Sequence, residues 1–214
     1  MDDIHITTTT VGEYDGVVDL TLPSDTILYQ FIVSGKLYQE IKGHAENWWS
    51  ENGKAASDPS GYSAGIKECP SLNGAISEVV VATAMYDVEN SIQAKKHDGG
   101  WDYEYKKETY DVKTTGMPYS VWITTSDVKN NQRVRYQMNA DWYVAVHEDS
   151  QHLNEGWMAG TVLGRVSKQV ILDNTKIEPG KRSEKKRYRH FVRKVSFSLL
   201  EPMPAPADLS ALIS

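Results

Sequence analysis

The chain has 214 residues, 40% hydrophobic and 24% charged, which is enough for one domain with a sizeable core. Its formal net charge of −6 argues against a surface coated in positive charge for nucleic acid, but it is compatible with a local basic surface. The single cysteine, Cys69, excludes an intrachain disulfide and fits a reducing compartment. Neither an apolar leader nor a run of about 18 apolar residues is visible, so we expect a cytoplasmic protein without a membrane partner.

The first fifty residues are predicted to form strands and then a long helix. Residues 1–22 alternate apolar and polar side chains, as strands do. Residues 23–25, Pro-Ser-Asp, are typical of a helix start, and the apolar face that follows predicts a helix to about Gly53. The pair Trp48-Trp49 near its end packs on the core or forms a ligand platform, and we favour the core. Residues 53–74, rich in Gly, Ser, Pro and Asn, are expected to be a long loop.

Residues 75–88 predict a helix that is apolar nearly all round and therefore buried, with Asn73 as its cap. Glu78 is the exception on this helix, because none of its neighbours one turn away can pair with it. A buried carboxylate without a partner is costly, so it must be protonated, hydrogen-bonded or bound to a metal ion. The alternative is that Glu78 points to solvent from a narrow polar stripe.

Residues 101–115 read as two short strands, because aromatic and β-branched residues recur there at period two. A two-residue turn at residues 106–107 would place Asp102 opposite Asp111, with Lys113 on the same face two residues further along. Like charges in directly opposed positions are destabilising, so this arrangement predicts a cation between the two carboxylates. Asp98 is a rival for the first carboxylate and His97 for a metal ligand or base, but both sit in a glycine-containing turn.

Residues 124–138 are predicted to form a polar helix that brings Arg133 and Arg135 to phosphate, with a solvated face as the alternative. Residues 140–146 form a nearly continuous apolar run, which is typical of a strand buried inside a sheet. Further strands are expected at residues 157–166 and 169–172.

A sharply basic segment follows, and residues 191–200 are expected to form a last strand or short element. The basic segment stands out in an otherwise acidic chain, so a phosphate-binding loop is favoured over a solvated loop. Its cations that we expect to contact DNA are Lys181, Arg182, Lys185, Lys186, Arg187 and Arg189.

The spacing of Asp102 from Asp111-Val112-Lys113 resembles the bipartite signature of the PD-(D/E)xK nucleases, the restriction-endonuclease-like superfamily. The second half, acid-x-Lys, matches in full, whereas Trp101 stands where the motif's name has Pro. The family also places a glutamate on the preceding helix, where Glu78 lies. The expected order of helix, strand, strand, helix and strand agrees with the core of that family.

The resemblance implies an α/β (α+β) fold, with a mixed sheet flanked by helices as a restriction-endonuclease-like core. We expect residues 61–202 to form this core, residues 1–60 an N-terminal extension of strand and helix, and residues 203–214 a C-terminal tail.

The function implied is Mg²⁺-dependent hydrolysis of DNA phosphodiester bonds, with Mn²⁺ able to substitute. Asp102, Asp111, the Val112 carbonyl and Glu78 would hold one or two metal ions, and Lys113 would orient the attacking water or stabilise the developing charge. DNA is the expected partner, and a homodimer is an open alternative. The competing function is a non-catalytic module that binds DNA, protein or carbohydrate on a similar fold.

Overall fold

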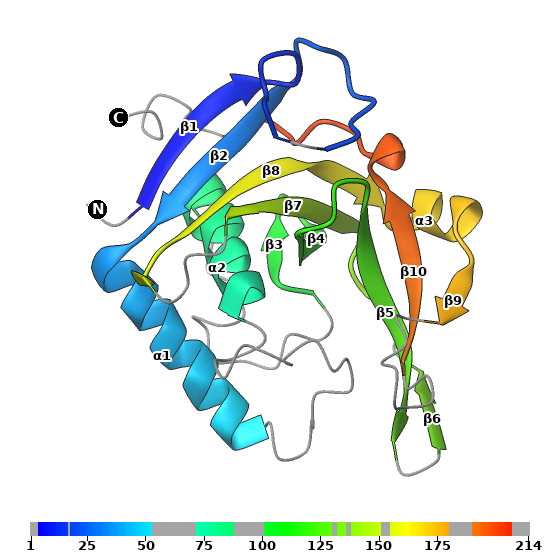
Figure 1. Ribbon diagram of the computed structural model, residues 1–214. Helices are drawn as coiled ribbons and strands as arrows, with labels where there is room; N and C mark the ends of the chain where they lie inside the picture. Colours follow the sequence, from blue (N-terminus) through cyan, green and yellow to red (C-terminus); the bar gives the residue numbers. More distant parts are fainter. Residues whose placement is uncertain are drawn as a thin grey trace.

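A computed structural model describes residues 4–16, 18–52, 72–87, 101–129, 132–135, 138–150, 155–179 and 190–206. Its main element is a curled mixed sheet of six strands in the order β1-β2-β8-β7-β4-β3 (Figure 1). These strands are β1 (Ile4–Thr10), β2 (Ile27–Val33), β3 (Tyr103–Tyr105), β4 (Glu108–Thr115), β7 (Trp142–Ser150) and β8 (Met158–Ser167). All neighbouring pairs are antiparallel except β4 and β7, which run parallel.

A second, antiparallel sheet has four strands in the order β6-β5-β10-β9. It consists of β5 (Ser120–Lys129), β6 (Gln132–Arg135), β9 (Ile177–Pro179) and β10 (His190–Ser196). The helical elements are α1 (Gly35–Asn52), α2 (Leu72–Val79) with a π-helical continuation (Val80–Met85), α3 (Lys168–Asn174) and a 3₁₀ turn (Phe197–Leu199). The fold class is therefore α+β, with a mixed sheet between helices on one face and the smaller sheet on the other.

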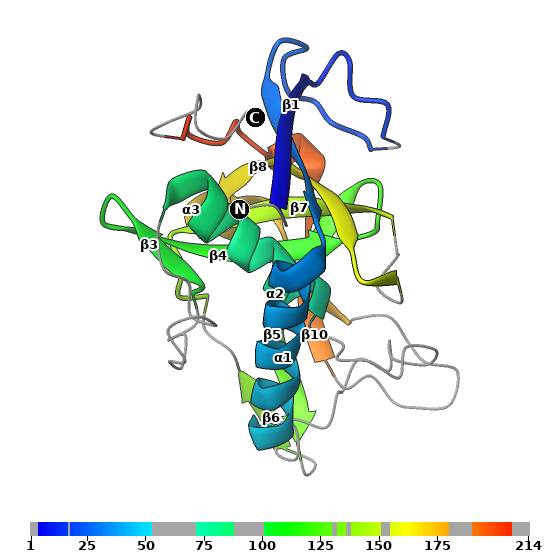
Figure 2. The same ribbon diagram turned by 90° about the vertical axis from the view of Figure 1, so that its left-hand side faces the viewer.

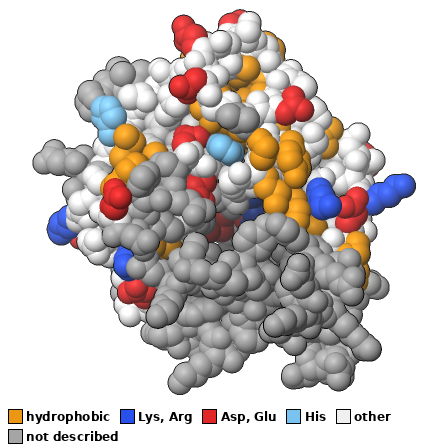
Figure 3. Space-filling model, viewed as in Figure 1, with side chains coloured by type: hydrophobic (Ala, Val, Ile, Leu, Met, Phe, Trp, Pro, Cys, Tyr) orange, Lys and Arg blue, Asp and Glu red, His pale blue; other side chains and the backbone are white. Residues whose placement is uncertain are grey.

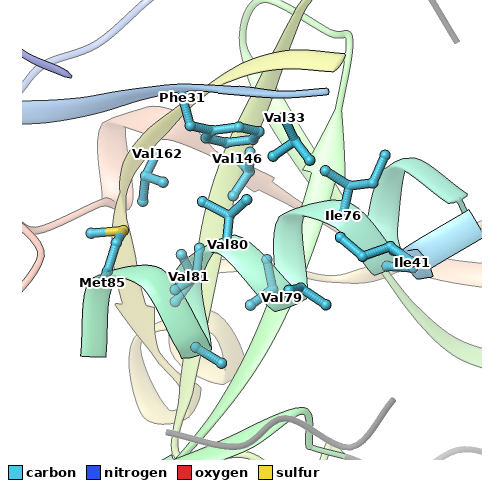
Figure 4. Close-up of a cluster of buried hydrophobic side chains, with 14 of the residues drawn as sticks. Phe31, Val33, Ile41, Ile76, Val79, Val80, Val81, Met85, Val146 and Val162 are labelled. Atoms are coloured by element: carbon cyan, nitrogen blue, oxygen red, sulfur yellow. The ribbon is translucent and has the colours of Figure 1, made fainter. Parts of the chain in front are cut away.

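The two faces of the six-stranded sheet bury different hydrophobic clusters. On one face α1, α2 and the π-helical segment pack against β2, β4, β7 and β8, as Figure 4 shows for Val80 opposite Phe31 and Val146. On the other face Tyr143 of β7 packs with residues of β5, β10 and α3. Because β7 is covered on both faces, its sequence is apolar without alternation, and the strand predicted at residues 140–146 is confirmed.

The predicted helix after residues 23–25 is wrong at its start, because Ile27–Val33 forms β2 between β1 and β8. An apolar run of this length fits both the helical and the strand periodicity, and the strand forms because these residues pair with β1 and β8. The helix α1 begins at Gly35, whose φ of +57° suits glycine at the change from strand to helix. Its end at Asn52 agrees with the predicted end near residue 53. The predicted cap Asn73 lies inside α2, which begins at Leu72.

The polar helix predicted at residues 124–138 is also wrong, because β5 and β6 form an antiparallel hairpin there. The β-branched residues of this stretch favour a strand. The connection from β4 to its parallel neighbour β7 therefore runs through a strand hairpin of the second sheet (Figure 1). The predicted order of helix, strand, strand, helix and strand is not observed.

The strand predicted at residues 169–172 is helix α3, which begins after Ser167. The Ser167 hydroxyl accepts a hydrogen bond from the Val170 N–H at 3.2 Å and so caps the first turn. The strand predicted at residues 157–166 is confirmed as β8. No helix within the described residues is long and apolar enough to cross a membrane.

Candidate functional site

The β3–β4 hairpin that the sequence predicts is present, with its turn at Lys106 and Lys107, and it projects at one side of the molecule (Figure 2). Both turn residues have positive φ, +51° and +69°, which is the backbone of the tight turn that matches strand twist. Tyr103 pairs with Tyr110, and the regular ladder ends there.

Asp102, one residue before β3, forms hydrogen bonds with the neighbouring strand β4 on both sides of Asp111. Its backbone N–H donates to the Tyr110 carbonyl at 2.7 Å, and its Oδ2 accepts from the Val112 N–H at 2.6 Å. The residues bonded on β4 are thus the ones immediately before and after Asp111. Both aspartates are buried, with 5% and 9% of their surface exposed.

Because β3 begins only at Tyr103, no described strand covers the far edge of β4 from Val112 onward. In a strand the N–H and C=O of one residue point to the same side, and the Val112 N–H points to Asp102. The Val112 carbonyl therefore faces the same open edge as the Asp102 carboxylate.

Lys113 supplies a positive charge directly to this pair of carboxylates. Its Nζ lies 2.5 Å from Asp111 Oδ1, and 31% of its side chain is exposed. Burial alone would lower the pKa of Lys113, but the charges of Asp111 and Asp102 outweigh it and hold that pKa above its usual value. Lys113 is consequently an ammonium at neutral pH and donates hydrogen bonds.

The pKa of Asp102 lies well above its usual value, mainly because the carboxyl is buried and further because Glu78 and Asp111 are close. Lys113 and the Val112 N–H act in the opposite direction without cancelling the effect. Glu78 of α2 is partly buried, and its charge acts on both Asp102 and Lys113. The structure thus brings Glu78, Asp102, Asp111 and Lys113 into one electrostatic unit, which we call the acidic cluster.

The acidic cluster fits a hard divalent cation by donor chemistry and by charge. Among the residues that the structure describes, no three carboxylate, imidazole or thiolate side chains converge closely enough to chelate a metal on their own. The Asp102 side chain and the Val112 carbonyl nevertheless present oxygen donors at one edge, with the Asp111 carboxylate near enough to raise the pKa of Asp102, and oxygen is what Mg²⁺ prefers. Figure 3 shows acidic side chains gathered around a depression near the middle of the face it draws.

Of the other predicted site residues, the structure describes only two. Arg133 and Arg135 lie on strand β6, paired with Val128 and Ser126 of β5, and not on a helix. His97, Asp98 and the basic residues lie outside the described residues, so their predicted roles stay predictions. Those basic residues are Lys181, Arg182, Lys185, Lys186, Arg187 and Arg189.

Sequence reasoning missed a second polar network, centred on Asp149. Its Oδ1 accepts from the Tyr14 hydroxyl at 2.8 Å and lies 3.0 Å from His147 Nδ1, while its Oδ2 accepts from the Thr161 hydroxyl at 2.6 Å. The available signal was the i, i+2 spacing of His147 and Asp149, which puts both on one face of a strand. The contributions of Tyr14 and Thr161 come from distant segments and had no local signal.

Comparisons of the chain with models of known protein families, with curated proteins and with solved structures each found no match. A function for this chain is therefore inferred from the chemistry of its own residues.

Proposed function

We propose that this protein is a metal-dependent nuclease, in the simplest form an endonuclease, that hydrolyses phosphodiester bonds of DNA. The observation that carries the proposal is the acidic cluster, in which buried carboxyl groups surround the Lys113 ammonium. When Asp102 and Asp111 are both ionised, the one lysine beside them leaves a net negative charge among these three side chains. Uncompensated buried charge is costly, and one divalent cation would neutralise it.

In this proposal Asp102, Asp111 and the Val112 carbonyl hold Mg²⁺, and Glu78 binds it directly or through a water molecule. When bound, the ion supplies a water of lowered pKa and a clamp for the scissile phosphate. The hydrogen bond from Val112 to Asp102 Oδ2 fixes the orientation of that carboxylate before any ligand arrives. A carboxylate so oriented loses little conformational freedom on binding, which favours a cation at this edge.

Lys113 acts on the phosphate and not as the base. Its raised pKa keeps the proton on Nζ at neutral pH, so it cannot accept a proton from water. Since Nζ is bonded to Asp111, it lies beside whatever Asp111 binds. A fixed ammonium at that place stabilises the negative charge that builds up on the phosphate oxygens during attack.

DNA is the proposed substrate because cations are concentrated in two segments of an acidic chain. The basic residues between 181 and 189 form one segment, and β6 with Arg133 and Arg135 forms the other. The β5–β6 hairpin extends away from the six-stranded sheet (Figure 1), so an arm of this kind is positioned to follow a nucleic-acid backbone.

A restriction-endonuclease-like core is part of the same proposal. It is supported by the succession of α2, the β3–β4 hairpin and the parallel pairing of β4 with buried β7. The strand hairpin between β4 and β7 departs from the helix that this resemblance leads one to expect.

The test is cleavage of supercoiled plasmid, linear duplex and single-stranded DNA in Mg²⁺ or Mn²⁺ and in EDTA. We expect the wild type to cut with metal and not in EDTA, and Asp111→Asn to be inactive. The matched control is Asp173→Asn, which changes an exposed aspartate of α3 and should cut like the wild type. Folded wild-type protein that binds DNA but cuts none of these substrates with either metal would instead support the non-catalytic binding module.

A further inference from the structure

The outer strands of the two sheets differ in how their open edges are protected. An open edge presents unpaired N–H and C=O groups, and proteins protect such edges with short strands, charged side chains, proline or bulges. Strand β3 has three residues and carries Glu104, β6 has two arginines among four residues, and β9 has three residues and ends at Pro179. Strand β1, at the outer side of the six-stranded sheet (Figure 1), has seven residues, pairs with β2 without a bulge and consists only of isoleucine, histidine and threonine. Of the outer strands that the structure describes, β1 is therefore the one with an unprotected edge.

Every second residue of β1 directs its backbone groups to this open edge. The Val11 N–H, directly after β1, donates to the carbonyl of Thr26, directly before β2, at 2.9 Å. In a strand the N–H and C=O of one residue point to the same side, and those of the next residue point to the opposite side. The N–H and C=O groups of Ile4, Ile6 and Thr8 therefore point away from β2. None of the residues that the structure describes forms a hydrogen bond with these outward groups.

The open edge of β1 is complementary to a second copy of itself. When two β1 strands lie antiparallel about a two-fold axis at Ile6, Ile4 of each copy pairs with Thr8 of the other, and Ile6 pairs with Ile6. Every outward N–H and C=O group then has a partner. His5 and Thr7, whose side chains are exposed, face each other between these pairs with Cα atoms about 4.5 Å apart. Although the net charge of the chain is −6, β1 contains no lysine, arginine, aspartate or glutamate, so the pairing opposes no like charges.

We propose that the β1 edge is a docking surface for a second copy of this chain, and that the two six-stranded sheets continue into one sheet across it. Seven residues from each copy are fewer than the about 20–30 residues a side of a standard interface, so the dimer is reversible and forms as the concentration rises. In the order β1-β2-β8-β7-β4, β4 lies four strand spacings, about 19 Å, from β1. The acidic clusters of the two copies therefore lie on either side of the interface and far from it. The inference thus goes beyond the proposed nuclease and does not depend on it.

The first measurement is sedimentation equilibrium of the full chain at concentrations from about 1 μM to about 1 mM, the range in which weak interfaces associate. We expect the wild type to pass from monomer to dimer. Thr8→Pro changes an exposed residue and removes its outward N–H, but it leaves the hydrogen bonds to β2 in place. Because each copy loses one bond across the interface, dimerisation should weaken about tenfold or more. The matched control is Thr8→Val, which keeps the N–H and should dimerise as the wild type does.

A cross-link tests the register of the two strands and keeps the proposal falsifiable if Thr8→Pro does not fold. In a Cys69→Ser background, the double variant His5→Cys/Thr7→Cys places thiols opposite each other in the close pairs, so oxidised glutathione should link two chains. His5→Cys alone is the control, because its two thiols would be diagonal neighbours with Cα atoms about 7–8 Å apart, too far for a disulfide.

Three results would each overturn the proposed interface. The first is a wild type that stays monomeric over the whole concentration range, which would leave the β1 edge to a strand of a different protein. The second is a Thr8→Pro dimer as tight as that of the wild type, which would place the interface elsewhere. The third is equal cross-linking of the single and the double cysteine variants, which would exclude the register centred on Ile6.

Discussion

Replacing Asp102 by Asn is expected to make the metal-free protein more stable and to remove its response to metal. The folded-state pKa of Asp102 lies above that of an unfolded aspartate, chiefly because the carboxyl is buried and then because Glu78 and Asp111 are near. The native state therefore binds more protons than the unfolded state, and stability falls as the pH rises through the folded-state pKa. An asparagine carries no charge and its side-chain carbonyl still accepts the Val112 hydrogen bond, so the variant escapes this cost.

The expected change in melting temperature has two sources, the removal of the Asp102 charge and the loss of metal binding. Removing an unfavourable charge commonly stabilises a protein by about 0.5–2 kcal/mol, which for a chain of this length raises the melting temperature by about 1–8 °C. A metal ion at 100 times its dissociation constant stabilises the wild type by about 2.7 kcal/mol, or about 5–10 °C.

Thermal melts in EDTA and in Mn²⁺ at pH 7.5 and pH 4 measure both the stability gained without metal and the shift produced by metal. The variant should melt higher than the wild type in EDTA at pH 7.5, lose most of that advantage at pH 4, and shift little with Mn²⁺. Asp173→Asn, on exposed α3, is the matched control and should show the wild-type metal shift. The reasoning is refuted if Asp102→Asn melts below the wild type in EDTA at pH 7.5, or if it keeps the full Mn²⁺ shift.

Two further predictions concern the Asp149 network and the basic segment. The folded-state pKa of Asp149 is lowered, so its stabilisation is present above the unfolded value and lost as the pH falls through the folded one. Because Asp149 is partly exposed, Asp149→Asn should cost only about 0.5–1.5 kcal/mol at pH 7 in denaturant melts, and a cost that persists unchanged at pH 3 would contradict this. Neutralising the basic segment should weaken DNA binding for all sequences and flatten the slope of log K against log salt by about 0.9 per lost contact, and an unchanged slope would show that the segment is only a solvated loop. The variant replaces by Ala Lys185, Lys186 and Arg187.

The features of the site that could be predicted from the sequence are those that depend on residues close together in the chain. Strict alternation between residues 101 and 115 located the hairpin and its turn, and parity alone put Lys113 on the face of Asp111. The apolar surroundings of Glu78 predicted a buried helix, and the structure has α2 there. These features depend on neighbours in the sequence, which is why a periodic pattern reveals them.

The errors arise where distant segments decide the outcome. Residues 27–33 fit both a helix and a strand by pattern, and pairing with β8 settles the matter. The polar residues of the β5–β6 hairpin carry no clear period, and their pairing with β10 across more than sixty residues is not visible locally. The network at Asp149 joins Tyr14 to β7 and β8, so only the folded chain assembles it.

The central claim is that Lys113 acts on the transition state of phosphodiester hydrolysis. The most direct measurement is the single-turnover cleavage rate of Lys113→Ala in saturating Mg²⁺, with DNA binding and the melting temperature measured in the same buffer. The matched control is Lys176→Ala, which truncates an exposed lysine between α3 and β9. Removing one group that stabilises developing charge costs about 10²–10³ in rate, so we predict a loss of that size or larger with folding and DNA binding retained. A folded, DNA-binding Lys113→Ala protein that cuts at close to the wild-type rate would contradict the account.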